Sequence, residues 1–83
     1  MTDQQILAMI REALFEVAPN KQFGEITLDS TIQDLHLDSI AIMEMVGVLE
    51  DRVDTTFPDE DLAKVQALKD LAALMRGSRV GAA

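Results

Sequence analysis

Residues 38–53 read Asp38-Ser39-Ile40-Ala41-Ile42-Met43-Glu44-Met45-Val46-Gly47-Val48-Leu49-Glu50-Asp51-Arg52-Val53, and the rest of the chain is organised around them. Apolar residues recur in this stretch with the period of an α-helix. We therefore predict a helix from Asp38 or Ser39 to about Val53. One apolar stripe of this helix should face the core, and it consists of Ile42, Met45, Val46, Leu49 and Val53.

The opposite side of this helix carries a second apolar strip. Ile40, Met43 and Gly47 lie nearly opposite the core stripe, and acidic residues surround them, namely Glu44, Glu50, Asp51 and Asp54. Single exposed apolar residues are common on soluble proteins and need no function. An apolar strip with an acidic rim is more typical of a surface that binds another protein. The pattern therefore predicts a protein-docking face.

The chain before this stretch predicts one more helix and a packed loop. Thr2 and Gln5 have the spacing of a capping box, and Pro19 cannot continue a helix, so we expect a first helix between them. Its expected core residues are Ile6, Ile10, Ala13, Leu14 and Val17. The long connection that follows has too many large apolar residues for a solvated linker. We expect one helical turn in it, capped by Ser30 and Gln33.

The chain after residue 53 predicts two shorter helices. Acidic residues from Asp59 to Asp61 suit a helix N-terminus, and we expect that helix to end near Lys64. A last helix should run from about Gln66 or Ala67, and its expected core residues are Leu68, Leu71, Ala72 and Met75. The fold class is therefore all-α, a small bundle of three main helices and one short helix with a long first loop.

We place one domain in residues 1–76 and expect residues 77–83 to be a disordered tail. Among the 83 residues, 15 acidic side chains face 7 basic ones, which gives a formal net charge of -8. This charge disfavours nucleic acids and anionic membranes as partners and favours proteins with basic patches. No signal-peptide pattern and no apolar run of membrane-spanning length is present, so we expect a cytoplasmic protein.

Ser39 is the candidate site, and several roles can be compared for it. A nucleophilic serine needs a base and an oxyanion hole, and the single histidine, His36, has no such constellation around it, so a hydrolase is strongly disfavoured and would be removed by an absence of thioester turnover. The acidic residues do not have the pattern of a calcium loop, and no metal is expected. Ser39 could simply cap the helix. As an acceptor, its hydroxyl would place a phosphodiester at the positive end of the helix dipole. Asp29-Ser30 repeats the dipeptide Asp38-Ser39, but only Ser39 leads into a long two-faced helix.

The run Asp34-Leu35-His36-Leu37-Asp38-Ser39-Ile40, together with the helix after it, resembles the attachment motif of acyl carrier proteins. The pattern of that family is Asp-Leu-Gly-x-Asp-Ser-Leu before an acidic amphipathic helix. Phe57-Pro58-Asp59-Glu60 is similar to the start of the family's short third helix, and Leu68-Lys69-Asp70-Leu71 to its last helix. The resemblance covers residues 3–75 in matching order and spacing.

The resemblance implies that Ser39 receives 4'-phosphopantetheine from coenzyme A through a phosphopantetheinyl transferase, with Asp38 helping to place metal and coenzyme A in that complex. The thiol of this arm would hold acyl groups as thioesters, and it would supply the thiol chemistry that a chain without cysteine lacks. The protein would then be a carrier and not an enzyme.

The resemblance also implies a set of partners. The helix would dock on basic patches of acyl-transferring or acyl-processing enzymes through Ile40, Met43, Glu44, Gly47, Glu50, Asp51 and Asp54, and residues 59–61 would extend this surface. The acyl chain would be sheltered by Ile42, Val46, Leu49, Leu62 and Leu71. We expect a monomer that serves fatty-acid, polyketide or specialised lipid synthesis.

Two positions depart from the family pattern. His36 replaces the usual glycine, which should reshape a turn that tolerates positive φ. Gly47 replaces a larger apolar residue. Both changes favour a specialised carrier over the general fatty-acid carrier. A D-alanyl or aminoacyl-type carrier and an unmodified acidic helical adaptor protein stay open as alternatives.

Overall fold

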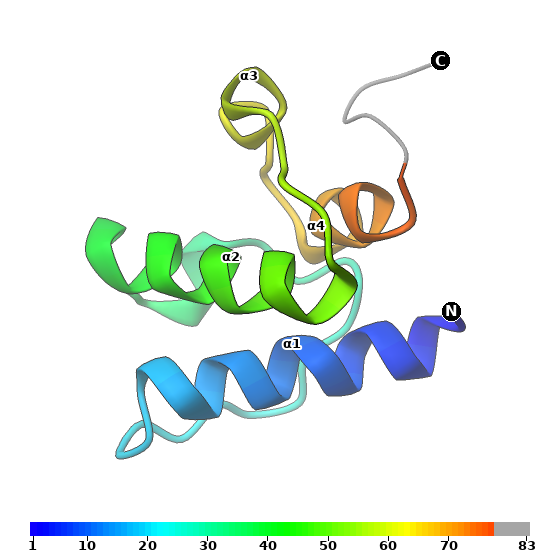
Figure 1. Ribbon diagram of the computed structural model, residues 1–83. Helices are drawn as coiled ribbons and strands as arrows, with labels where there is room; N and C mark the ends of the chain where they lie inside the picture. The colour runs from blue at the N-terminus through cyan, green and yellow to red at the C-terminus, as the bar shows by residue number, and fades with distance from the viewer. Residues whose placement is uncertain (78–83) are drawn as a thin grey trace.

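The computed structural model describes residues 1–77, and its regular structure is helical apart from one isolated β-bridge. The main helices are α1 (Asp3–Val17), α2 (Ser39–Val53) and α4 (Leu68–Met75), and the short ones are η1 (Gln33–Leu35), a 3₁₀ helix, and α3 (Asp59–Leu62). Figure 1 shows α1 and α2 side by side with opposite chain directions and α4 close to one end of this pair. This arrangement confirms the expected all-α bundle. Nearly all of the expected tail lies outside the described residues.

Both ends of α1 follow the sequence signals. The Thr2 hydroxyl accepts a hydrogen bond from the Gln5 amide at 3.1 Å, and the Gln5 side chain accepts one from the Thr2 amide at 2.9 Å. This reciprocal pair is a capping box, as the sequence predicts. The helix ends at Val17, two residues before Pro19, because proline disfavours helical geometry in the residue before it.

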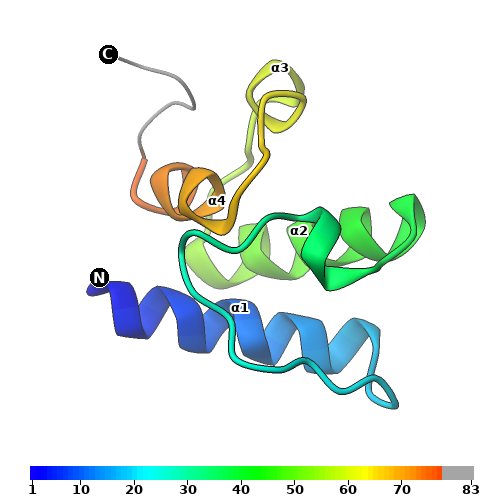
Figure 2. The same cartoon turned by 180° about the vertical axis from the view of Figure 1, so that it is seen from behind.

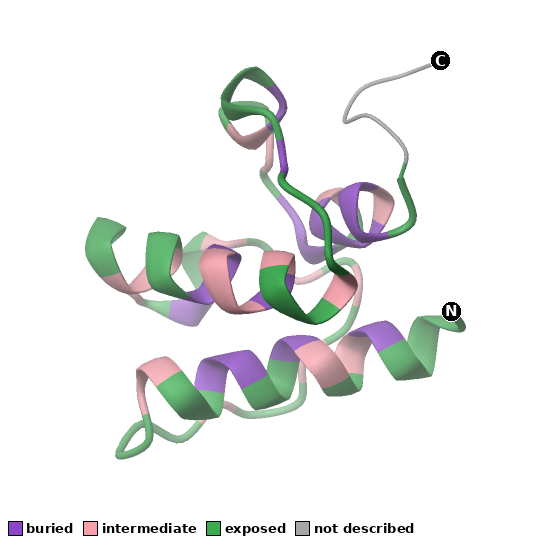
Figure 3. Cartoon of the chain, in the orientation of Figure 1, coloured by how far each residue is buried: buried purple, intermediate pink, exposed green. Residues whose placement is uncertain are grey.

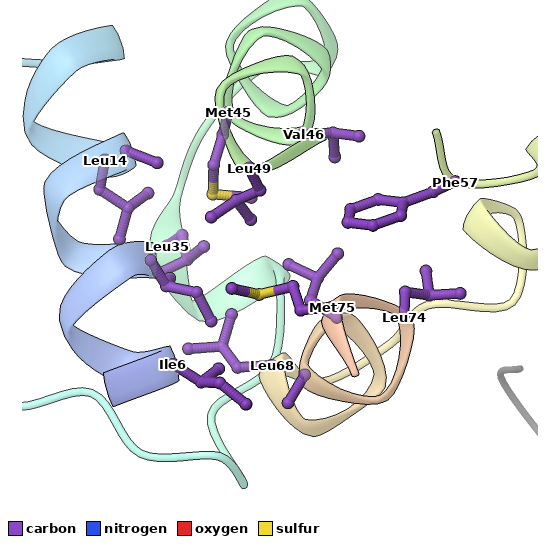
Figure 4. Packing of buried hydrophobic residues seen from close by; sticks show 14 residues of the cluster. Ile6, Leu14, Leu35, Met45, Val46, Leu49, Phe57, Leu68, Leu74 and Met75 are labelled. Carbon is purple, nitrogen blue, oxygen red and sulfur yellow. The ribbon is translucent and has the colours of Figure 1, made fainter. Parts of the chain in front are cut away.

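The core lies where α1, α2 and α4 meet the long loop (Figures 3 and 4). Its buried hydrophobic residues are Ile6, Ile10, Ala13, Leu14, Leu35, Met45, Val46, Leu49, Phe57, Leu68, Leu71, Ala72, Leu74 and Met75. Most of the expected core residues are among them, while Val17, Ile42 and Val53 are only partly buried. Val17 and Val53 are the last residues of their helices, and Ile42 lies at the wall of a small cavity, so fewer neighbours cover each side chain.

The loop between α1 and η1 packs on the bundle, as its composition predicts (Figure 2). Phe23, Ile26, Leu28 and Ile32 are partly buried against the core. The loop backbone also caps α4, because the carbonyls of Ser30 and Leu28 accept hydrogen bonds from the first amides of that helix at 2.9 and 2.8 Å. The bridge between Thr31 and Ala67 belongs to the same pairing.

Two expectations about the short helices are wrong in detail. The capped turn in the loop uses Thr31 and Asp34, which exchange two hydrogen bonds of 3.1 Å, rather than Ser30 and Gln33. Ser30 is used elsewhere, since its hydroxyl accepts a hydrogen bond from the Thr27 amide. Helix α3 ends at Leu62, not near Lys64, because residues 63–65 continue as tighter turns.

Candidate functional site

Ser39 is the first residue of α2, and its side chain is exposed. The residue before it, Asp38, has extended backbone angles and is the N-cap of the helix. The carboxylate of Asp38 accepts a hydrogen bond from the Ala41 amide at 2.8 Å. Asp38 therefore satisfies the helix end, and the hydroxyl of Ser39 is not needed for capping.

The same helix end favours negative charge. The first amide groups of an α-helix have no acceptor within the helix, and they carry the positive end of its dipole. A phosphodiester on the Ser39 hydroxyl would lie beside these groups. The exposed position leaves room for a partner enzyme to reach that oxygen.

The turn before Ser39 keeps a left-handed residue. His36 has φ 54° and ψ 39°, so the positive φ expected for the family's glycine is retained with a histidine in its place. The Lys21 ammonium donates a hydrogen bond to the His36 carbonyl. Nearby, the Thr31 amide and hydroxyl hold the pKa of the Asp34 carboxyl below its usual value. The expected reshaping of this turn is wrong.

The predicted docking strip is on the surface of α2. Ile40 is 72% exposed and Met43 is 57% exposed, while Glu44 and Asp51 are exposed beside them. Gly47 is partly buried, and a Cβ built on it would meet nothing within 4 Å. The strip therefore has two large apolar side chains, a gap at Gly47 and an acidic edge.

Other acidic residues of the predicted surface are placed differently. Glu50 is partly buried, and its carboxylate accepts a hydrogen bond of 2.6 Å from the Phe57 amide, which ties α2 to the loop after it. Asp54 is exposed and ends α2 with a left-handed backbone. Asp61 is only 1% exposed, so the expectation that it extends the docking surface is wrong. Asp61 faces inward because a single helical turn must bury one side to pack on the bundle.

Arg52, the only base in this acidic stretch, faces α1. Its guanidinium forms ion pairs with Glu12 and Glu16, and the carboxylate of Glu16 raises its pKa. Its positive charge is thus matched by α1 and does not offset Glu44 and Asp51. The pairing leaves the exposed edge of α2 acidic.

A small apolar cavity of about 90 Å³ opens beside the predicted docking strip. Its walls contain only apolar side chains, namely Ile32, Ile42, Met43, Met45, Val46, Leu62, Val65 and Leu71. Four of the five residues expected to shelter an acyl chain are among them, and Leu49 is not. Met43 belongs to both the cavity wall and the exposed strip.

Comparison with known proteins agrees with this geometry. The sequence profile of the phosphopantetheine attachment site matches residues 4–75. The acyl carrier protein of an Exiguobacterium species is 42% identical over 74 residues, covering 88% of this chain and 92% of that protein. The chain belongs to the acyl carrier protein family.

Two further relatives show the breadth of the family. The acyl carrier protein of Rhodococcus erythropolis is 32% identical over 76 residues, with 90% of this chain and 82% of that protein covered. The meromycolate extension acyl carrier protein of Mycobacterium tuberculosis is 34% identical over 77 residues, with 92% of this chain and 66% of that protein covered.

Membership of this family defines the chemistry in outline. An acyl carrier protein is a carrier and not a catalyst, and it holds a covalent 4'-phosphopantetheine group. That group supplies a thiol, which this chain, having no cysteine, does not contain. The residues present fit it, because an exposed hydroxyl, a helix N-terminus and an apolar cavity occur around one end of α2.

Within residues 1–77, no group of three or more acidic or histidine side chains could hold a metal ion. None of the helices in that range is both long and apolar enough to cross a bilayer.

Sequence reasoning missed one surface feature. Phe15 on α1 is 67% exposed and lines an open hollow of about 550 Å³ with Ala8, Arg11, Glu12, Glu16 and Arg52. The helical period alone places Phe15 on the side of α1 away from the core, and this is the signal in the sequence that predicts its exposure.

Proposed function

We propose that Ser39 carries the 4'-phosphopantetheine arm of this acyl carrier protein. The main support is that two neighbouring residues at the start of α2 have different roles. Asp38 caps the helix with its carboxylate, and Ser39 presents an exposed hydroxyl beside the uncapped amides. In the proposal, this chain orients the hydroxyl, favours the phosphodiester charge and offers an apolar surface beside the arm.

The attachment is tested by incubating the protein with coenzyme A and a broad-specificity phosphopantetheinyl transferase. We expect a gain in intact mass of one phosphopantetheinyl unit and no gain for Ser39→Ala. Ser30→Ala is the matched control, because Ser30 also follows an aspartate, and this variant should be modified fully. Modification of Ser39→Ala would contradict the assignment.

We also propose that Ile40, Met43, Glu44, Gly47, Asp51 and Asp54 form the surface that docks on basic patches of the transferase and of acyl-processing enzymes. The support is a strip of exposed apolar side chains with an acidic edge. Glu50 contributes mainly to the structure through its bond to Phe57. Complementary charge of this kind speeds association and weakens as salt rises.

Charge reversal tests the docking surface. Glu44→Lys or Asp51→Lys should lower kcat/KM for transfer of the arm by roughly tenfold at low ionic strength, with a smaller loss at high salt. Glu25→Lys is the control, because it changes the net charge equally at an exposed loop residue that is not part of α2. An equal loss for all three variants would mean that net charge alone steers the partner.

The cavity supports an acyl cargo over an aminoacyl cargo. Its walls offer no acceptor side chain for an ammonium group, and burial of an unpaired charge is costly. At about 90 Å³ it is smaller than the ~150 Å³ apolar cavity that holds benzene, so a long chain must displace wall side chains. We propose carriage of acyl groups in fatty-acid, polyketide or specialised lipid synthesis, with Gly47 favouring a dedicated pathway.

A further inference from the structure

Methionine thioethers are the only sulfur atoms of this chain, and they differ greatly in exposure. Met45 is 0% and Met75 5% exposed, so the fold protects both, and Met9 is partly buried. Met1 and Met43 are 50% and 57% exposed. Met43 is the one exposed methionine within a helix, and it lies on the proposed docking surface.

Gly47 leaves Met43 uncovered. A helical side chain leans toward the N-terminus and covers the turn before it, so a large residue at position 47 would lie over the turn that contains Met43. A Cβ built on Gly47 meets nothing within 4 Å, which shows that no other element fills this space. Glycine at position 47 therefore leaves the Met43 side chain, four positions earlier, without a covering side chain.

We propose that Met43 is a site of reversible oxidation by peroxides and that its oxidation weakens docking on α2. In the reaction, the Met43 sulfur attacks one oxygen of hydrogen peroxide and the O–O bond breaks. A sulfur–oxygen bond forms, and the second oxygen leaves as water after proton transfer. The sulfur loses two electrons and the peroxide gains them. Reductases of methionine sulfoxide reverse the change.

The sulfoxide would alter two features at once. The Met43 side chain would present a polar, hydrogen-bonding oxygen in place of apolar surface, at its position between Ile40 and Gly47 in the strip. The same oxygen would also lie at the wall of the apolar cavity. A partner that covers the strip would have to desolvate this oxygen without a matching donor. This effect on docking rests on the proposed function, whereas the oxidation itself does not.

Selectivity is tested on the full chain before the arm is attached, because the arm would add a second oxidisable sulfur. Dilute hydrogen peroxide should convert Met43 and Met1 to sulfoxides before Met9, Met45 and Met75, as read by peptide mass. Gly47→Leu should slow oxidation of Met43 severalfold and leave that of Met1 unchanged. Met9→Leu should change neither rate. Oxidation of Met45 as fast as Met43, or equal Met43 rates with and without the leucine, would overturn the proposal.

The effect on docking is tested by the rate of arm transfer. The oxidised chain should show kcat/KM lowered by roughly tenfold, restored by methionine sulfoxide reductases. The Met43→Leu variant is measured before and after peroxide treatment, and the treatment should not change its rate of arm transfer. If untreated protein accepts the arm and the oxidised protein accepts it equally fast, this inference fails alone. If untreated protein never accepts the arm, the proposed function fails, and the order of oxidation still tests the site.

Discussion

Asp38 and Ser39 are neighbours in sequence but do different things at the start of α2. The carboxylate of Asp38 reaches the Ala41 amide, which is the geometry of an N-cap. The Ser39 backbone is already helical, so its hydroxyl points outward from the first turn. A serine can therefore start a helix here without serving as its cap, and its oxygen can be used for chemistry.

His36 shows how one residue can keep a turn at some cost in stability. Its left-handed backbone is strained for residues with a Cβ, and glycine relieves this strain. We expect His36→Gly to be more stable than His36→Ala by about 1 kcal/mol in chemical denaturation. Both variants remove the imidazole, so their difference isolates the backbone. A glycine variant less stable than the alanine variant would contradict a left-handed residue at this position.

At the scale of elements, α2 has two faces with different roles. Met45, Val46 and Leu49 are buried in the core (Figure 4). Ile40 and Met43, on the other side of the helix, are exposed. The contrast arises because 3.6 residues per turn place these two sets on opposite sides of one helix. One element thereby holds the core together and presents a surface, and the surface can vary without disturbing the core.

Asp70 fixes the start of α4, and it gives a pH-dependent prediction. Hydrogen bonds from the Gln66 and Ala67 amides lower the pKa of its carboxyl below the usual value. The folded state therefore holds this proton less tightly than the unfolded state. Its contribution is complete above the unfolded pKa of about 3.9 and is lost as pH falls through the lower folded value.

We expect Asp70→Asn, which keeps an acceptor oxygen but loses the negative charge at the helix N-terminus, to lower the free energy of unfolding by about 0.5 kcal/mol at neutral pH, with a gap from the wild type that narrows below about pH 4. Urea denaturation at several pH values measures this gap. Asp29→Asn removes the same charge from an exposed loop position and serves as the control. A gap that stays constant down to the lowest pH would contradict the capping role of the carboxylate.

At the scale of the whole molecule, we expect the net negative charge to lower the stability of the folded state. The formal net charge is -8, and the ion pairs of Arg52 and Arg76 are partly exposed, with 38% of each arginine side chain accessible. Exposed pairs contribute little, whereas repulsion among many like charges destabilises a compact state. Salt screens both the repulsion and the ion pairs, and we expect the repulsion to be the larger of the two.

Added sodium chloride should therefore stabilise this protein. We expect Tm to rise by roughly 5 °C between low salt and about 0.5 M, measured by circular dichroism. Arg52→Gln, which loses its pairs with Glu12 and Glu16, should show at least as large a rise. A fall in Tm with salt would mean that the ion pairs outweigh the repulsion.

The local patterns of the sequence were enough to predict the helices, the two faces of α2 and the position of Ser39. Hydrophobic period, capping spacing and proline act over a few residues, so they can be read without knowing what packs where. The helix termini therefore agree with expectation to within one or two residues, as at α1 and α2.

Only the tertiary contacts determined which of several similar charged residues are buried or paired. Asp61 and Asp59 look alike in sequence, but one is buried because α3 turns that side to the bundle. Glu50 binds the Phe57 amide and Arg52 binds α1, so two charges beside the docking strip serve the fold instead. The burial of a side chain and its pairing partner depend on residues that are distant in sequence. A local sequence pattern does not show which of these residues will pack against it.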